Sequence, residues 1–376
     1  MAFVITNVHI VLPDRVVSGK ELLIEKGLIK NVIAQGSFKG QRVDGKGGYL
    51  MPGFIDLHVH GGAGYHFIDG ENIEQILNYH LTGGTTGLLV TTLSGNREQW
   101  EKARNACLRS YPFLPRIFGI HIEGPVVNPQ KAGIHQVREL GISQLDSMKQ
   151  FIADYKEVVR LVTLAPELPG MEKFIPWLCS HNIVVAAGHS EASQKKLAWS
   201  EGLGLSRVTH LFNAMPLFHH RKPGIAGESL LNNNITVELI ADGIHLHPSV
   251  VEIVLLLKTY EKVSLVTDAV AMAGLPDGSR GTIAGQIVTV REKGVYNQEG
   301  ILAGSSLTMI EAVRNMVSFT NCPLWQAVFM ASTLPARTLG IQHLVGSIEN
   351  GKQANLILTD RQLNMQKVWL DGVCVI

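Results

Sequence analysis

The chain has 376 residues, 45% of them hydrophobic and 17% charged, so it can bury a large core and exceeds the usual size of one simple domain. Its 33 basic and 32 acidic residues give a formal charge of +1, which offers no general attraction for nucleic acid or an anionic membrane. The four cysteines form no CxxC pair, no basic leader precedes the first apolar residues, and no run approaches the roughly 18 apolar residues of a membrane span, so we expect a cytoplasmic protein.

Both ends of the chain have the character of short strands separated by turns. Residues 16–24 and 27–33 are predicted as strands, and the C-terminal segment repeats this pattern with a hairpin-like turn at Asp371. We therefore predict that residues 1–52 and 342–376 pair into one small β-sandwich domain. Because no disordered linker joins these two segments to residues 53–341, the domain should pack closely on the rest of the chain.

Residues 53–341 alternate between short apolar runs and stretches of helical character, which is typical of repeated βα units around a parallel sheet. The predicted strands are 54–60, 87–92, 117–123, 159–167, 183–189, 207–213, 236–242 and 263–268. Eight strands close a TIM (β/α)8 barrel, an α/β fold whose active site lies at the C-terminal ends of the strands. A doubly wound open sheet would give the same alternation, but ligands to one metal would then come from only a few strands.

The predicted strand ends carry groups suited to a metal site. His58 and His60 project to the same side of the first strand because successive side chains alternate, and imidazole is the commonest ligand of catalytic zinc. The other strand ends of this kind carry Glu123, His189, His210 and Asp268. One carboxylate and two histidines make the three-ligand set of a catalytic zinc site, where the pKa of a bound water falls to about 7. Asp268, on the last strand, is placed to take the proton of that water.

Each of these residues taken alone also has a structural explanation. His189 would fit a satisfied barrel histidine, Glu123 a helix cap and Asp268 an N-cap. Their joint placement at successive strand ends favours a shared site over three separate coincidences.

Nine segments carry a family resemblance, and they occur in this order: PGFIDLHVHGG, HIEGP, APE, AGHS, THLFNAMP, RKPGIAG, IADGIH, LVTDA and AGSSLTM. With them the chain resembles the N-acetylglucosamine-6-phosphate deacetylase family of the amidohydrolase superfamily over essentially its whole length, THLFNAMP being the most distinctive segment. The resemblance implies hydrolysis of the N-acetyl group of a phosphorylated amino sugar, a small-molecule substrate, by a metal-dependent enzyme that pairs as a homodimer.

The resemblance also assigns the metal and the catalytic groups. It implies that Glu123, His189 and His210 hold one divalent metal. It further implies that Asp268 is the catalytic acid/base and that His135 helps to polarise the acetyl carbonyl. The ligand types suit zinc, although iron, manganese or cobalt would fit similar ligands. Family members vary at the HxH pair, and because this chain keeps both histidines we predict a second metal at His58 and His60, bridged to the first through Glu123.

The substrate contacts come from the resemblance as well. The residues implied in gripping the sugar phosphate are Asn213, Ala214, Arg221 and His245, and those implied on the acetyl side are Leu307 and Met309. Arg221 offers a planar fork suited to a phosphate, although residues 219–222 would also fit a solvated loop.

Two other functions stay open at this point. The same chemistry could act on N-acetylgalactosamine 6-phosphate, which differs only at the fourth carbon of the sugar, and no residue in the sequence distinguishes that hydroxyl. A non-catalytic amidohydrolase-like scaffold is the alternative from another class. Such scaffolds characteristically lose metal ligands, whereas this chain keeps every expected one.

Overall fold

The computed structural model, which describes residues 2–376, contains a ring of parallel strands. These strands are β5 (Phe54–Val59), β8 (Thr85–Leu93), β9 (Arg116–Glu123), β10 (Val159–Leu164), β11 (Val184–Ala187), β12 (Arg207–Val208), β13 (Thr236–Leu239) and β14 (Val263–Leu265). Each pairs with the next in chain order, and a parallel bridge between Val59 and Ala269 joins the last strand to the first. The eight predicted strands and the barrel are confirmed, and β5 is buried on both faces, as the core strand of a barrel must be.

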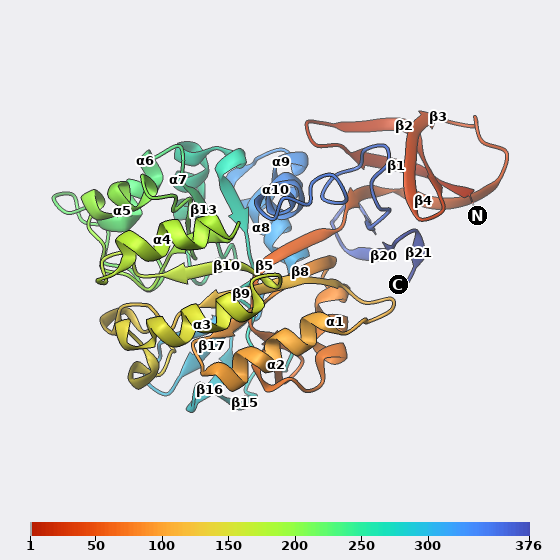
Figure 1. The fold of residues 1–376 in the computed structure, drawn as a ribbon. Helices are drawn as coiled ribbons and strands as arrows, with labels where there is room; N and C mark the ends of the chain where they lie inside the picture. The colour runs from red at the N-terminus through yellow and green to blue at the C-terminus, as the bar shows by residue number, and fades with distance from the viewer. Residues whose placement is uncertain (1) are drawn as a thin grey trace.

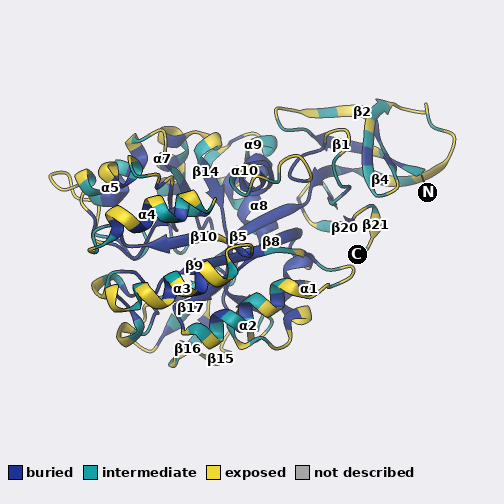
Figure 2. Cartoon of the chain, viewed as in Figure 1, coloured by how far each residue is buried: buried dark blue, intermediate teal, exposed yellow. Residues whose placement is uncertain are grey.

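Helices surround the barrel, and their exposed residues lie on the faces turned away from it (Figure 1, Figure 2). They are α1 (Ile73–Thr82), α2 (Arg97–Leu108), α3 (Leu145–Tyr155), α4 (Met171–Ser180), α5 (Gln194–Glu201), α6 (Gly224–Leu231), α7 (Pro248–Lys258), α8 (Met309–Thr320), α9 (Leu324–Val328) and α10 (Leu334–Thr338). Helix α3 is typical: it buries Met148, Phe151 and Ile152, whose spacing puts them on one face. Within residues 2–376, every helix falls short of the length and apolar character needed to cross a membrane.

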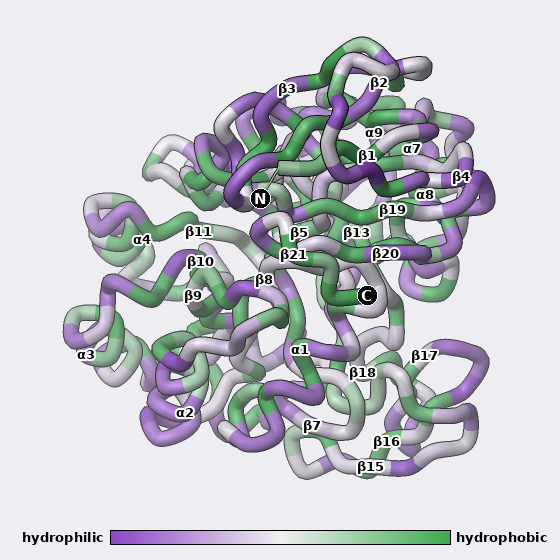
Figure 3. Tube along the Cα trace, turned by 90° about the vertical axis from the view of Figure 1, so that its right-hand side faces the viewer, coloured by the Kyte–Doolittle hydropathy of each residue, from purple (hydrophilic) through white to green (hydrophobic). Residues whose placement is uncertain are grey.

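The two ends of the chain share one seven-stranded sheet beside the barrel, here called the terminal sheet. Its strands are β1 (Ala2–Val11), β2 (Val16–Glu25), β3 (Leu28–Ala34), β4 (Gln41–Pro52), β19 (Leu356–Thr359), β20 (Met365–Leu370) and β21 (Val373–Cys374). Antiparallel pairing of Leu50 with Leu358 connects the N-terminal strands to the C-terminal ones, as predicted. Figure 3 views the molecule from this side, with both termini facing the reader.

Strand β4 passes directly into β5 through Gly53, which ties the terminal sheet to the barrel. A Cβ at this glycine would lie 2.2 Å from Thr86 Oγ1, so a larger side chain would push the first two barrel strands apart. Ser332 donates a hydrogen bond to the Gly53 carbonyl at 2.8 Å. The junction therefore holds the sheet closely against the barrel.

A further four-stranded antiparallel sheet follows the last barrel strand, and the sequence analysis did not predict it. Its strands are β15 (Arg280–Ile283), β16 (Gln286–Arg291), β17 (Gly294–Asn297) and β18 (Leu302–Ser305), and a short hairpin, β6 (Gly61–Gly62) with β7 (Tyr65–His66), lies after β5. Gln286 donates a hydrogen bond to the Ile134 carbonyl at 3.2 Å, which ties this inserted sheet to the loop after β9. The alternating, β-branched run 286–291 was the available sequence signal.

Candidate metal centre and substrate cavity

The ligand residues lie at or just beyond the C-terminal ends of barrel strands, where the chain leaves regular strand geometry. Glu123 is the last residue of β9. His189, His210 and Asp268 follow their strands with φ values of 46°, 31° and 50°. Residues other than glycine seldom adopt this left-handed region, and such conformations concentrate at functional sites. Here the turn directs each side chain inward over the barrel axis.

Glu123, His189 and His210 form the first metal group. Oε1 of Glu123 lies 3.2 Å from Nε2 of His189 and 3.0 Å from Nε2 of His210, and the two imidazole nitrogens are 3.1 Å apart. His189 Nδ1 is 2.8 Å from the Lys131 carbonyl, so this nitrogen carries the proton and Nε2 presents its lone pair to the group.

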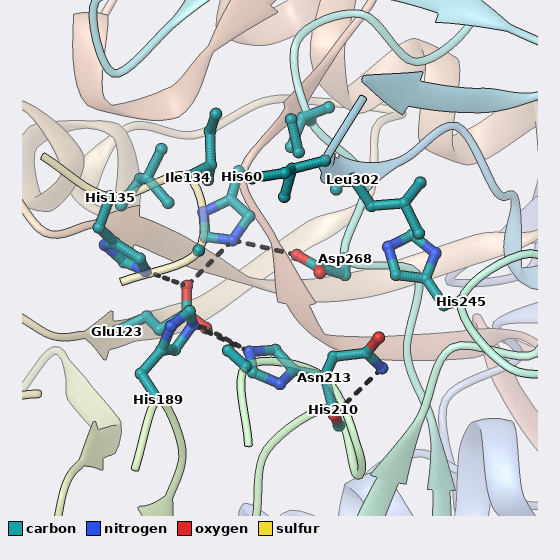
Figure 4. A pocket seen from close by; sticks show the side chains of 17 residues that line it. His60, Glu123, Ile134, His135, His189, His210, Asn213, His245, Asp268 and Leu302 are labelled. Carbon is teal, nitrogen blue, oxygen red and sulfur yellow. Dashed lines mark hydrogen bonds and ion pairs between the residues drawn. The ribbon is translucent and has the colours of Figure 1, made fainter. Parts of the chain in front are cut away.

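His58, His60 and Asp268 form the second metal group. The Nε2 atoms of the two histidines are 3.2 Å apart, and Asp268 Oδ1 lies 3.2 Å from His60 Nε2 and 3.5 Å from His58 Nε2. Glu123 reaches this group too, at 3.3 Å from each histidine. Figure 4 shows His60, Glu123 and Asp268 pointing toward one another. Glu123 is therefore placed between the two groups.

The donor sets fit divalent metal ions. In each group the three possible ligand atoms lie within 4.8 Å of one another. Two imidazole lone pairs only 3.1 to 3.2 Å apart repel unless a proton or a cation lies between them. Nitrogen and carboxylate oxygen are the ligand types that zinc and related ions prefer. An ion bound in each group would therefore offset the free-energy cost of burying these polar side chains.

Both acidic groups of the centre are ionised at neutral pH. Burial alone would raise the pKa of Glu123, but the charge of His58 and the close contacts of His189 and His210 hold that pKa well below its usual range. Burial likewise opposes ionisation of Asp268, and the charge of His58 with the contact from His60 brings its pKa to about 2. Both carboxylates can thus act as anionic ligands or as proton acceptors.

A cavity of about 260 Å³ opens over these groups. The predicted residues that line it are His60, Glu123, His135, His189, His210, Asn213, Ala214, His245 and Asp268. His58 lies beneath them and is fully buried. The lining residues that sequence reasoning missed are Leu93, Gly133, Ile134, Val270, Ile301, Leu302, Ala303 and Gly304. Several of these belong to the inserted sheet, whose position over the strand ends had no local sequence signal.

The structure does not bring Arg221, Leu307 or Met309 to this cavity. Arg221 lies on an exposed loop, where its guanidinium contacts His220 at 2.8 Å. Leu307 lines a neighbouring cavity, because the chain turns after β18 through a hydrogen bond from the Leu307 backbone to Ser305 Oγ. Met309 begins α8 and is fully buried in the core. Within residues 2–376, residues 301–304 supply an apolar part of the cavity wall instead.

His135 presents a free nitrogen to the cavity. Its Nδ1 pairs with Ser94 Oγ, and Nε2 is buried without a hydrogen-bond partner, 3.6 Å from Glu123 Oε2. Burial is the main cause that lowers the pKa of His135 to about 4, so the ring is neutral at physiological pH. Ser94 is itself held in place, because Trp100 donates a hydrogen bond to its carbonyl at 2.8 Å. A neutral His135 can offer Nε2–H to a carbonyl oxygen.

His245 and Asn213 are fixed at the other side of the cavity. Asp242, which was not among the predicted site residues, lies 2.6 Å from His245 Nδ1 and also accepts the backbone N–H of His245 at 2.8 Å. The amide of Asn213 donates to the His210 carbonyl at 3.2 Å. Both side chains are thereby oriented before any ligand binds, which lowers the entropy cost of binding.

Burial of His80 should make the free energy of unfolding depend on pH. It is 1% exposed, and burial lowers its pKa from the usual 6.5 to about 4, opposed only by its hydrogen bond to the Gly61 carbonyl. Between these pH values the unfolded chain binds the proton and the folded chain does not. Stability should therefore fall as pH drops from 6.5 toward 4, by about 3 kcal/mol from this residue at roughly 1.4 kcal/mol per pH unit. Urea unfolding at several pH values measures it, and His80→Gln should flatten the dependence; an unchanged slope would contradict the assignment.

Fold and site together define a barrel enzyme with a two-part candidate metal centre, and comparisons with known proteins agree. Residues 49–375 match the amidohydrolase family. An N-acetylglucosamine-6-phosphate deacetylase of Lysinibacillus sphaericus is 35% identical, covering 89% of this chain and 87% of that protein. An N-acetylgalactosamine-6-phosphate deacetylase of Escherichia coli O157:H7 is 36% identical, covering 86% of each. The crystal structure of N-acetylglucosamine-6-phosphate deacetylase from Pasteurella multocida superposes with a TM-score of 0.92 at 31% identity and covers 99% of both chains.

The chain belongs to the amidohydrolase family. The resemblance seen in the sequence segments is confirmed, and it extends over nearly the whole chain.

Proposed function

We propose that this chain hydrolyses N-acetylglucosamine 6-phosphate to glucosamine 6-phosphate and acetate. The observation that carries the proposal is the placement of Asp268, a member of the second metal group, next to the first metal group in the wall of one cavity. The deacetylases of L. sphaericus and P. multocida support the substrate. The retained ligands argue against the scaffold alternative.

The metal ions are part of this proposal. Zinc at the first metal group, with a second ion at His58 and His60 bridged through Glu123, would generate a nucleophile from water and polarise the acetyl carbonyl. Nitrogen and carboxylate ligands support zinc as the metal, and the convergence of Asp268 on the second group supports a second ion.

The chain's own residues move the protons. Asp268 accepts a proton from the attacking water and delivers it to the amine nitrogen as the C–N bond breaks, so that a neutral amine leaves. His135 donates its Nε2–H to the acetyl oxygen, where negative charge develops. Donors aimed at developing charge in a buried site are commonly worth several kcal/mol. Asn213, Ala214 and His245 would hold the sugar, since they line the same cavity as His135.

The phosphate contact and the oligomeric state are linked in this proposal. Arg221 does not line the cavity of its own chain, and apolar side chains gather around its loop and on α6 and α7. The most exposed are Leu217 (91%), Leu256 (76%) and Leu231 (69%). Exposed apolar groups of this kind mark protein interfaces. We propose a homodimer in which this face is covered and Arg221 serves a phosphate at the subunit boundary.

Arg221→Ala should weaken the phosphorylated substrate far more than its unphosphorylated counterpart. A charge-assisted hydrogen bond contributes about 1.5–3 kcal/mol, so kcat/KM for the phosphorylated sugar should fall roughly 10- to 100-fold. Lys222→Ala on the same loop is the matched control, because it removes a neighbouring cation. Equal losses for both substrates would reject the phosphate role of Arg221.

The reaction is tested by measuring amine release from N-acetylglucosamine 6-phosphate and N-acetylgalactosamine 6-phosphate, before and after chelation and zinc re-addition. Chelator-sensitive preference for the first substrate is the expected result. Preference for the second substrate would leave the mechanism unchanged and change the sugar. This alternative is specific because the E. coli relative is an N-acetylgalactosamine-6-phosphate deacetylase. No release from either would reject the proposed hydrolysis.

Two broader proposals accompany the reaction. The terminal sheet supports a β-sandwich domain of residues 1–52 and 342–376 beside a catalytic barrel of residues 53–341. The four cysteines are all free thiols, which supports a cytoplasmic location.

A further inference from the structure

Glu238 is a fully buried carboxylate directly beneath the candidate metal centre. It lies on β13, and its Oε2 is 3.1 Å from Nδ1 of His58. The same oxygen accepts the backbone N–H of His210 at 3.4 Å. One carboxylate therefore contacts a member of each metal group, although it does not line the cavity.

Arg207 holds Glu238 from the other side. This arginine is 1% exposed, and its Nε donates to Glu238 Oε1 at 3.0 Å while Nη1 donates to Thr338 Oγ1 at 3.3 Å. Because arginine stays charged in proteins, its partner is an ionised carboxylate that can only accept hydrogen bonds. His58 Nδ1 must therefore donate to Glu238, which leaves Nε2 as the His58 nitrogen that can bind an ion in the metal groups.

Among the described residues, the other ligand histidines lack the carboxylate partner that His58 has at Nδ1. His189 Nδ1 meets only a backbone carbonyl, that of Lys131. The Nδ1 atoms of His60 and His210 have no hydrogen-bond partner among the described residues. A carboxylate behind a ligand histidine fixes its tautomer and raises its basicity, and loss of such a partner typically costs 10- to 100-fold in metal affinity.

We propose that Glu238, held by Arg207, is a positioning residue that fixes the tautomer of His58 and thereby sets the affinity of the second metal group for its ion. This inference rests on the proposed two-ion centre and adds a residue that touches neither the ion nor the substrate. The first metal group should depend on Glu238 much less, because its contact there is a longer one to the backbone of His210.

The test compares Glu238→Gln with the wild-type chain by dialysis against zinc with a competing chelator, counting bound ions by atomic spectrometry. The wild type is expected to bind two ions. The variant should keep the first with unchanged affinity and bind the second about 10- to 100-fold more weakly. With cobalt in place of zinc, the absorption spectrum should change for the second ion only. Glu21→Gln is the matched control, since Glu21 is an equally buried carboxylate that pairs with Arg42 in the terminal sheet.

Each outcome decides the inference. Wild-type affinity for both ions in Glu238→Gln would overturn it, and so would equal weakening of both, which indicates a general structural effect. A wild-type chain that binds one ion would reject the second site together with this inference, while amine release tests the reaction separately. If Glu238→Gln does not fold, the double variant Arg207→Met, Glu238→Leu removes the acceptor without leaving an unpaired buried charge, and the same split between the ions is expected.

Discussion

Asp268→Asn is expected to lower kcat for amine release by about 10²- to 10⁴-fold, the range in which positioned acid/base groups contribute. Asparagine keeps the size and one oxygen of the side chain but can neither accept the proton of water nor pass it to the amine. The pKa of Asp268, about 2, means that the wild-type side chain is ionised, and so has a free oxygen lone pair for a proton, throughout the neutral range. The first metal group does not include this residue, so its ion should stay bound.

The measurement is kcat together with the metal content of the same sample. Asp360→Asn is the control, because Asp360 lies in the turn before β20 and caps the backbone of Gln362 and Asn364 far from the site. Near-normal turnover of Asp268→Asn with full metal content would overturn the acid/base assignment. A variant that has lost its first ion would show instead that Asp268 supports the metal rather than the proton transfer.

The barrel was predictable because its strands are continuous apolar runs. The residues at which these strands end were not predictable. The predicted strand 207–213 contains only two residues of regular strand, β12. Beyond these, His210 and Phe212 adopt φ values of 31° and 75°, which end the pairing and turn the ligand inward. Hydrophobic pattern specifies which segments are buried, but the point where a strand bends depends on the contacts that its last side chains make.

The ligand residues were predictable for a related reason: each follows an apolar strand, and parallel strand ends meet in space. The contacts between distant segments were not. Glu238 was placed on a predicted strand, yet its partner His58 is 180 residues away. Likewise, Leu302 reaches the cavity only because β18 folds back over the strand ends. Such contacts depend on how the whole chain folds, and the hydrophobic periodicity of the sequence does not indicate them.

Glu123→Gln is expected to remove both ions and to lower turnover by roughly 10³-fold or more, since loss of several kcal/mol of metal assistance costs about tenfold per 1.4 kcal/mol. Glu123 contacts histidines of both metal groups through its two oxygens. Glutamine supplies one oxygen without charge and turns an amide toward an imidazole lone pair. Metal content by atomic spectrometry and amine release are measured on the same preparation.

The pattern of metal loss distinguishes a shared carboxylate from two independent sites. If Glu123 serves both ions, they should leave together in Glu123→Gln, whereas His60→Asn should release the second ion alone. Chelated wild type should behave like Glu123→Gln and recover when zinc is restored, while the variant should not. Retention of either ion at wild-type affinity in Glu123→Gln would mean that the carboxylate is not shared, and the two metal groups would then have to be treated as separate sites.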